Sequence, residues 1–268
     1  MNTPRLLAVR ALTALALIVL SAFSMAAPAW AATPERPAQV GAPYSLMQMN
    51  LCLSGGARCY PDTEYPKILD EAVERIQEND VNAVTFNEAC SGDVEKIAER
   101  TGYHMRFATV LYPTTPYQCK TPGGRGVFGN AVLTKEAIMS AQDAAYSRWN
   151  GSEQRRWLCV TTARGVDVCT THLSTDGEAD PASANNLQCG ELRAVLESRT
   201  NPTVFGGDMN RQASCAPEGF WTLTDDDAAQ LPGIQHVYGN TGQPTLEIEG
   251  ATYTDHDVMI ARAVIPKP

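Results

Sequence analysis

Two patterns of apolar residues alternate along the chain, one typical of helices and one typical of strands. Residues 65–78 place apolar side chains at helical spacing, whereas runs such as residues 81–86 have the length and composition of buried strands. Helices are predicted at residues 65–78, 93–100 and 181–199, with Ser91 as a candidate cap for the second. Strands are predicted at residues 45–51, 81–86, 103–109, 129–133, 156–162, 166–173, 202–205, 234–238 and 258–264.

The order of these elements mixes hairpins with crossover connections. Residues 156–162 and 166–173 are joined by the turn Arg164-Gly165, whereas the helix at 181–199 connects more distant strands. This mixture predicts an α/β fold with either one mixed sheet or two sheets packed face to face between helices.

The first 31 residues have the pattern of a cleavable signal peptide. Arg5 and Arg10 precede a short apolar run, and Ala29-Trp30-Ala31 fits a small-x-small cleavage site. We expect residues 32–43 to form a flexible strap and residues 44–268 to form one domain. The apolar run is too short to favour a membrane span, and no later segment has the required length. The sequence therefore predicts a secreted protein without stable membrane insertion.

All 8 cysteines follow the predicted signal peptide. An even number in an exported protein favours disulfides, and the lack of a C-x-x-C pair argues against a metal site. The spacing suggests the pairs Cys52–Cys59, Cys159–Cys169 and Cys189–Cys215, which leaves Cys90 and Cys119.

The charge balance is acidic. The formal charge of −9 becomes −11 when Arg5 and Arg10 leave with the signal peptide, because 19 basic residues then face 30 acidic ones. This excludes a broadly basic, nucleic-acid-coating surface. An enzyme that cuts a phosphodiester with a metal is not excluded, since it needs only local Lys and Arg.

The segment Gly206-Gly207-Asp208-Met209-Asn210 follows the predicted strand at residues 202–205. We expect the glycines to end this strand and to present Asp208 and Asn210 at its carboxyl end, where open α/β sheets bind ligands. A carboxylate and an amide two residues apart can hold a water or a metal. Gly, Asp and Asn also form ordinary turns, so this segment needs partners elsewhere in the chain.

Other strand ends supply such partners. Asn50 interrupts an apolar strand, and Glu88 follows a buried one, where a carboxylate is costly unless it is paired, hydrated or bound to a hard cation. His172 ends the second strand of the hairpin, and Asp255-His256 precedes the last strand. Each residue alone also fits a turn or a structural role, but together they outline one site.

These motifs, in this order, resemble the endonuclease/exonuclease/phosphatase superfamily, which includes pancreatic-type deoxyribonuclease. The resemblance runs from Asn50 to Val258. It implies a four-layer α-β-β-α sandwich, with two mixed sheets face to face and the helices outside, and metal-dependent hydrolysis of a phosphate ester. The motifs are Phe86-Asn87-Glu88, Gly129-Asn130-Ala131-Val132-Leu133, Thr171-His172-Leu173, Gly207-Asp208-Met209-Asn210 and Thr254-Asp255-His256.

The resemblance also implies residue roles. Glu88 would hold Mg²⁺ or Mn²⁺, with Asn50 or Asp255 nearby, and a structural Ca²⁺ stays open. Asp208 would orient or deprotonate the attacking water, and Asn210 would fix Asp208 or the phosphate. His172 and His256 would bind phosphate oxygens or act as acid and base, and the division between them stays open.

Asn87 stands where the family has Gln and Thr254 where it has Ser, but a third departure matters more. The family carries an Asp that orients the terminal His, and Gln235 stands at that position in Ile234-Gln235-His236-Val237-Tyr238. A Gln oxygen can accept the imidazole N–H but carries no charge to stabilise an imidazolium, so reduced activity stays open. Asn130, within its strand motif, is a further candidate orienting residue.

The predicted substrate is DNA or RNA, since a secreted phosphodiesterase suits a nuclease. A sphingomyelinase or phospholipase C-like activity, a phosphoinositide phosphatase, and a non-catalytic binding or toxin-subunit role stay open as alternatives. Arg125 lies in the Gly-rich loop Gly123-Gly124-Arg125-Gly126, and Arg155 lies close to Trp149 and Trp157. Both are candidate phosphate contacts. We expect a monomer.

Overall fold

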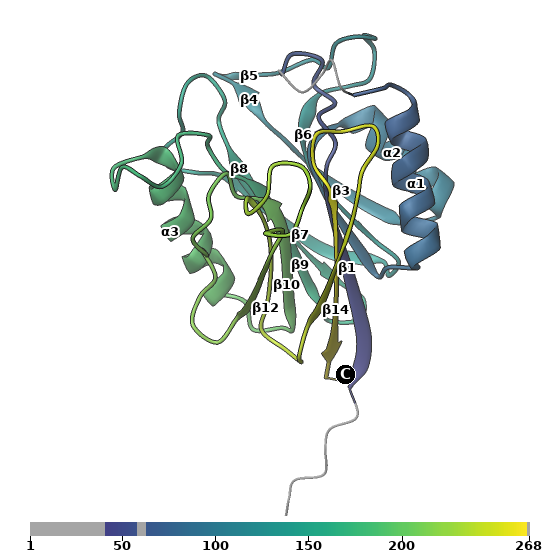
Figure 1. Ribbon diagram of the computed structural model, residues 1–268, viewed down its shortest axis with the longest axis vertical. Coiled ribbons are helices and arrows are strands. Elements are labelled where there is room, and N and C mark those ends of the chain that lie inside the picture. The colour runs from purple at the N-terminus through teal and green to yellow at the C-terminus, as the bar shows by residue number, and fades with distance from the viewer. Residues whose placement is uncertain (1–40, 58–62, 267–268) are drawn as a thin grey trace, which may run out of the picture. The chain divides into compact units, whose positions relative to one another are not determined.

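Two large sheets face each other, with helices on both outer sides (Figure 1). The computed structural model describes residues 41–57 and 63–266, so the predicted signal peptide and residues 32–40 of the predicted strap lie outside the described residues. The first strand begins at Ala42 rather than Ser45, which places the end of the predicted strap within a sheet. The expected four-layer α-β-β-α sandwich is confirmed.

The first sheet has six strands in the order β13-β14-β1-β2-β6-β3. Among these strands β1 and β2 run parallel, while every other neighbouring pair is antiparallel. Helix α1 (Lys67–Asn79) connects the parallel pair, and α2 (Ser91–Thr101) follows β2. The strands are β1 (Ala42–Asn50), β2 (Ala83–Cys90), β3 (His104–Thr109), β6 (Phe128–Thr134), β13 (Thr245–Glu249) and β14 (Val258–Ile265).

The second sheet repeats this plan in the order β11-β12-β10-β9-β8-β7. Its parallel pair is β9 and β10, which α3 (Ala184–Glu197) connects. The strands are β7 (Ile138–Ala145), β8 (Arg156–Thr162), β9 (Asp167–His172), β10 (Thr203–Asp208), β11 (Trp221–Thr224) and β12 (Gln235–Gly239). A separate two-stranded hairpin pairs β4 (Leu111–Tyr112) with β5 (Thr115–Pro116).

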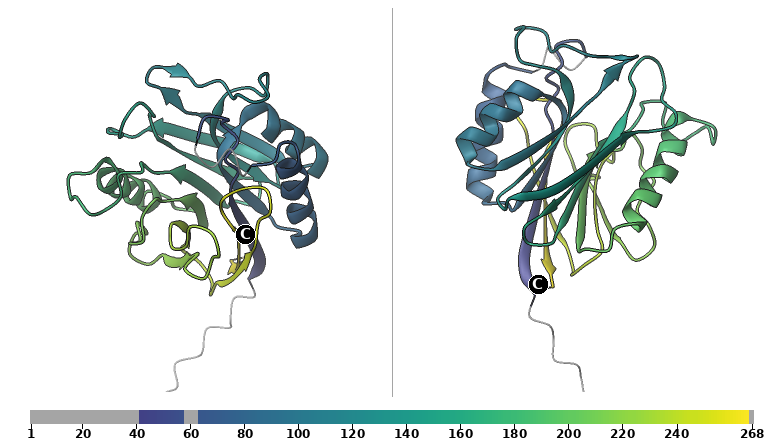
Figure 2. Two further views of the ribbon diagram at one scale, coloured as in Figure 1. Left: turned by 45° about the horizontal axis from the view of Figure 1, so that its top comes forward. Right: turned by 180° about the vertical axis from the view of Figure 1, so that it is seen from behind.

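Apolar side chains fill three spaces between the four layers. Neighbouring residues on a strand point to opposite faces, so Met47 and Met49 of β1 pack under α1 and α2, while Leu46 packs between the sheets. On the other side, Leu192 and Leu196 of α3 pack against the second sheet. Figure 2 shows the same division from two further directions, with α3 on one side of the sandwich and α1 and α2 on the other.

The two parallel pairs bring the candidate site residues together. Asn50 at the end of β1 is in register with Asn87 of β2, and His172 at the end of β9 is in register with Asp208 of β10. Parallel strands connected by a helix end at the same edge of their sheet. Because the sheets face each other, both edges contribute to one site.

The two adjacent glycines lie within β10 and do not end it. The strand predicted to end at Phe205 continues to Asp208. A Cβ on Gly206 would lie 2.4 Å from Oγ1 of Thr85 in the opposite sheet, and a Cβ on Gly207 would lie 2.3 Å from the carbonyl oxygen of Thr171. The glycines therefore allow close packing on both faces of β10, immediately before Asp208.

We expect Gly206→Ala to destabilise the protein by about 1–3 kcal/mol, because the added methyl group forces the sheets apart in a close-packed interior. Urea unfolding followed by circular dichroism measures this change. Gly190→Ala is the matched control, since nothing lies within 4 Å of its added Cβ in α3, and helix propensity should make it neutral or stabilising. Equal stability of the two variants would contradict this account of Gly206.

Several elements differ from the sequence prediction. Strands β7, β11 and β13 were not predicted, because their exposed positions carry polar or small residues that dilute the strand pattern. Ser91 is the first residue of α2 and does not cap it; its Oγ accepts a hydrogen bond from the backbone N–H of Val127 (3.1 Å). Within the described ranges, no helix is long and apolar enough to cross a bilayer.

Between cysteines that are both among the described residues, there are three disulfides. They are Cys90–Cys119, Cys159–Cys169 and Cys189–Cys215. Cys159–Cys169 crosses the β8–β9 hairpin at paired positions, and Cys189–Cys215 ties α3 to the loop after Asn210. Cys59 of the predicted Cys52–Cys59 pair lies outside the described residues. Three disulfides indicate an extracellular or otherwise oxidising environment.

Candidate active site

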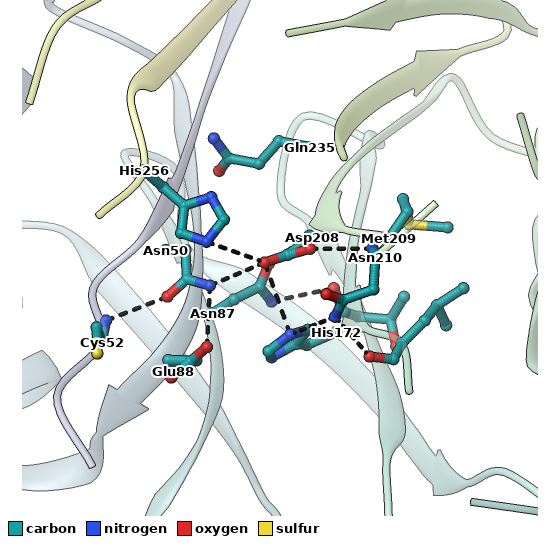
Figure 3. Close-up of polar contacts among 12 residues, drawn as sticks. Asn50, Cys52, Asn87, Glu88, His172, Asp208, Met209, Asn210, Gln235 and His256 are labelled. Atoms are coloured by element: carbon teal, nitrogen blue, oxygen red, sulfur yellow. Dashed lines mark hydrogen bonds and ion pairs between the residues drawn. The ribbon is translucent and has the colours of Figure 1, made fainter. Parts of the chain in front are cut away.

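The ends of the two parallel pairs border a pocket of about 460 Å³. Figure 3 shows the polar side chains of both sheets turned towards one another at this point. The predicted residues that line the pocket are Glu88, Arg155, His172, Asp208, Asn210, Asp255 and His256.

Asp208 is the buried centre of the site. Its Oδ2 accepts a hydrogen bond from Nδ2 of Asn50 (2.9 Å) and lies 3.6 Å from Nε2 of His172 and 3.5 Å from Nε2 of His256. Its Oδ1 accepts a hydrogen bond from the backbone N–H of Asn210 (3.0 Å). Burial raises the pKa of Asp208, but the two imidazoles and these hydrogen bonds outweigh burial and hold the pKa below its usual value. Asp208 is therefore an ionised carboxylate that faces two histidines.

Asn210 determines which nitrogen of His172 carries the proton. Its Nδ2 donates to Nε2 of His172 (2.9 Å) and to the carbonyl oxygen of Leu173 (2.9 Å). A flipped amide would turn its oxygen towards that carbonyl, so we assign Nε2 as the acceptor and place the proton on Nδ1. Burial and the positive charge of Arg155 lower the pKa of His172 to about 3. Burial therefore favours the neutral form of the His172 imidazole, while Asp208 beside it favours the charged form.

Two site residues adopt the left-handed backbone conformation. Glu88 has φ 51° and Asn210 has φ 49°. The β2–β6 pairing shifts register between Phe86 and Ala89, so Glu88 lies in a β-bulge. Bulges redirect side chains, and positive φ is costly for a non-glycine residue, less so for Asn. The local distortion turns the Glu88 carboxylate into the pocket.

Asn87 joins the two sheets behind the site, a role that sequence reasoning missed. Its Oδ1 accepts the backbone N–H of Asp208 (2.7 Å), and its Nδ2 donates to the carbonyl oxygen of Thr171 (3.0 Å). Nδ2 also donates to Oδ1 of Asn130 (3.1 Å), which places Asn130 in this buried network and not in the pocket lining. The position of Asn87 directly before Glu88 was the available signal.

Asn50 bridges the two carboxylates. Its Nδ2 donates to Asp208 and also to Oε1 of Glu88 (3.2 Å), while its Oδ1 accepts the backbone N–H of Cys52 (3.1 Å). Turning the amide over would direct its oxygen at both carboxylates. Asn50 therefore presents a nitrogen to both carboxylates in this structure and lies next to Glu88, the residue predicted to hold the metal.

Glu88 fits the requirements of a hard cation. Burial raises its pKa to about 7, and the hydrogen bond from Asn50 offsets only part of this effect. A nearby divalent cation would stabilise the charged carboxylate. In the part of the chain that the structure describes, no group of three or more His, Cys, Asp or Glu could hold a metal alone. Mg²⁺ needs only one or two carboxylates when waters and substrate phosphates complete its shell.

Comparison with protein families agrees with this geometry. The model of the Endonuclease/Exonuclease/phosphatase family matches residues 67–258. The chain belongs to this family. Members of the family hydrolyse phosphoric esters, and this chain is a hydrolase of that kind. No curated protein sequence matches the chain at a significant level.

Solved structures of the family share the fold at low sequence identity. A family member from Bacteroides thetaiotaomicron is 12% identical with a TM-score of 0.59, and the match covers 84% of this chain and 98% of that one. ANGEL2, a 2′,3′-cyclic phosphatase in complex with adenosine-2′,3′-vanadate, is 12% identical with a TM-score of 0.57, covering 84% and 96%. TDP2 from D. rerio, complexed with single strand DNA product, is 10% identical with a TM-score of 0.54, covering 82% and 98%.

The departure from the family pattern at Gln235 has a structural consequence. Gln235 Nε2 donates to the backbone oxygen of Asp257 (2.8 Å) and to Oδ2 of Asp225 (3.3 Å). Figure 3 draws both Gln235 and His256, and no hydrogen bond joins them. Nδ1 of His256 is buried and has no hydrogen-bond partner among the described residues. The expected hydrogen bond from the imidazole to Gln235 is not formed.

Arg125 does not reach the site, which corrects the prediction of a phosphate contact. It is 2% exposed, and its Nη1 pairs with Oδ2 of Asp93 at 2.7 Å. Its Nη2 donates to the carbonyl oxygens of Leu53 and Lys120. Arg125 therefore anchors its loop to α2 and to the segment after β1. Of the other histidines, His236 lies within hydrogen-bond distance of the hydroxyl of Tyr238 (2.6 Å) and is structural.

Proposed function

We propose that this protein is a secreted, divalent-cation-dependent phosphodiesterase that hydrolyses nucleic acid. The observation that carries this proposal is the position of Asp208, whose Oδ2 lies 3.6 Å and 3.5 Å from the Nε2 atoms of two histidines in the pocket that Glu88 borders. A buried carboxylate with two imidazoles can hold a water and bind phosphate oxygens, while Glu88 supplies an anionic ligand.

Asp208 is suited to orient the attacking water. Its ionised carboxylate accepts a proton from a water at the pocket surface, and Asn50 together with the Asn210 N–H keeps the carboxylate in place. The Nδ1 atom of His172 is buried and has no hydrogen-bond partner among the described residues, so we assign His172 to the positioning of Asp208, whose Oδ2 lies 3.6 Å from its Nε2. His256, on the other side of Asp208, is placed to bind a phosphate oxygen or to move a proton to or from it.

Glu88 is the residue that we assign to Mg²⁺ or Mn²⁺, with Asp255 as a second carboxylate on the same pocket. When bound, such a cation neutralises charge on the phosphate and on the leaving oxygen. Asn50 contributes by orienting Glu88 and not as a ligand.

Nucleic acid is the substrate class that the surroundings support best. Arg155 lines the pocket close enough to Glu88 and His172 to shift both pKa values, so a cationic group stands where a phosphate would bind. The solved relatives include proteins bound to single strand DNA product and to an adenosine derivative. Secretion is supported by the disulfides and by the signal-peptide pattern of residues 1–31.

A substrate panel tests this proposal. Purified mature protein is incubated in Mg²⁺ with plasmid DNA, RNA, sphingomyelin and phosphoinositides, and the products are separated by gel or chromatography. We expect cleavage of nucleic acid and little turnover of the lipids. Turnover confined to sphingomyelin or phosphoinositides would replace the nuclease by that activity, and inertness towards all four would favour a binding or toxin-subunit role.

A further inference from the structure

One wall of the active-site pocket is aromatic. Tyr112, Tyr117 and Phe128 line it, with ring centroids 4.9 Å apart for the two tyrosines and 6.3 Å and 6.2 Å from each tyrosine to Phe128. Phe128 is buried, and the tyrosines are half-buried. The edge-to-face contacts with Phe128 hold both rings in position. We call these three residues the aromatic wall.

The aromatic wall is attached to the strand that carries Glu88. Cys119, two residues after Tyr117, forms a disulfide with Cys90, two residues after Glu88. The backbone N–H of Lys120 also donates to the carbonyl oxygen of Ser54 (3.0 Å). The wall therefore has a defined position relative to the reacting groups.

Glu153 and Arg155 lie beside the aromatic wall, and each has a polar atom without a hydrogen-bond partner among the described residues. The hydroxyl of Tyr112 donates to Oε2 of Glu153, and Nη2 of Arg155 pairs with the same oxygen at 3.0 Å. Nη1 of Arg155 and Oε1 of Glu153 are buried and lack a hydrogen-bond partner among the described residues. The Arg155 side chain is 8% exposed, and both residues line the pocket. A buried donor and a buried acceptor of this kind are costly unless a ligand uses them.

The charges around the wall favour an anionic ligand. The ammonium group of Lys120 lies 4.9 Å from the ring centroid of Tyr117, and Lys120 is exposed, so it is free to turn towards a phosphate. A quaternary ammonium headgroup would compete with Lys120 for the ring and would meet Arg155. A nucleotide offers the opposite charge, a flat apolar ring system and hydrogen-bonding edges.

We propose that the aromatic wall is a subsite for an unstacked nucleobase and that Arg155, held by Glu153, binds the phosphate next to it. This subsite rests on the proposed nuclease function. A base in a duplex is stacked and paired, and removing it costs free energy that a single strand does not require. Aromatic side chains accept any base, because every base has a π-face. The preferred substrate is therefore single-stranded nucleic acid of broad sequence.

The test compares three oligonucleotides of equal length: a single strand, its duplex, and the same strand with abasic residues through its central segment. We expect the wild-type kcat/KM for the single strand to be about 10-fold or more above the values for the duplex and for the abasic strand. One base-stacking contact contributes a factor of this size. Tyr117→Leu should cleave the single strand and the abasic strand at similar rates, while Tyr117→Phe should keep the preference. Tyr103→Leu, a half-buried tyrosine that does not line the pocket, is the matched control and should behave as wild type.

Thermal unfolding of each variant shows whether a loss comes from the fold. Equal cleavage of all three oligonucleotides by wild type would overturn the subsite and leave the nuclease proposal standing. Cleavage of none would refute the proposed function and the subsite with it. Hydrolysis of sphingomyelin that Tyr117→Leu abolishes, with no effect on oligonucleotides, would assign the wall to a choline headgroup.

Discussion

Asp208→Asn is expected to lower kcat/KM for DNA by about 10²- to 10⁴-fold, the contribution typical of a positioned acid or base. The substitution keeps the size of the side chain but removes the charge that faces His172 and His256. It also removes one acceptor for the Asn50 amide, whose other partner is Glu88. The loss should therefore appear in kcat, because the water is no longer oriented, with a smaller change in KM.

Asp167→Asn is the matched control for this variant. Asp167 is also a buried strand carboxylate, 3% exposed, at the opposite end of the same parallel pair. It accepts hydrogen bonds from Oγ1 of Thr161 (2.7 Å) and Nδ2 of Asn201 (3.1 Å), far along the strands from the pocket. We expect it to change stability but not kcat. Wild-type turnover by folded Asp208→Asn protein would refute the role of Asp208.

Glu88→Gln is expected to weaken Mg²⁺ binding and to lower hydrolysis by about 100-fold or more at limiting Mg²⁺, since the cation loses its anionic ligand. Mn²⁺ titration followed by electron paramagnetic resonance measures binding without reference to activity. Excess Mg²⁺ should restore part of the rate. Glu99→Gln, an exposed substitution of the same kind on α2, should leave both quantities unchanged. Unaltered Mn²⁺ affinity in Glu88→Gln would exclude Glu88 as the ligand.

The same variant has an expected effect on stability in the absence of metal. Burial raises the pKa of Glu88 to about 7 in the folded protein, above its value in an unfolded chain. Between the two pKa values, Glu88 is ionised in the unfolded chain but still protonated in the folded protein. The unfolded state therefore binds fewer protons, and the free energy of unfolding falls as pH rises towards 7. In Glu88→Gln this pH-dependent fall in the free energy of unfolding is absent. Denaturant titrations of chelator-treated wild type and variant at pH 5 and pH 8 measure the difference.

The residue pattern along the chain predicts where the site residues lie in the fold. It predicts the contacts that they make less well. His172 and Asp208 were placed at strand ends from local apolar runs, and the parallel register of β9 and β10 confirms that these ends meet. The β-bulge at Glu88 was not predicted, because it depends on how β2 pairs with β6, which is distant in sequence. The amide orientation of Asn50 likewise depends on two carboxylates from other strands.

Arg125 shows why charge in a loop is a poor guide to function. The glycines around it indicate a flexible, exposed loop, yet its partner Asp93 lies on a helix and burial of the pair follows from the tertiary fold. The sequence shows that Gln235 departs from the family pattern. Its actual partners, Asp225 and Asp257, were beyond sequence reasoning because both belong to separate loops.

Hydrolysis of plasmid DNA by chelator-treated protein, with and without restored Mg²⁺, tests the central claim most directly when Asp208→Asn is assayed beside wild type. The account predicts no cleavage without the cation, full cleavage by wild type once Mg²⁺ is restored, and at most trace cleavage by Asp208→Asn under the same conditions. Cleavage that resists the chelator, or equal rates for the two proteins in Mg²⁺, would contradict it.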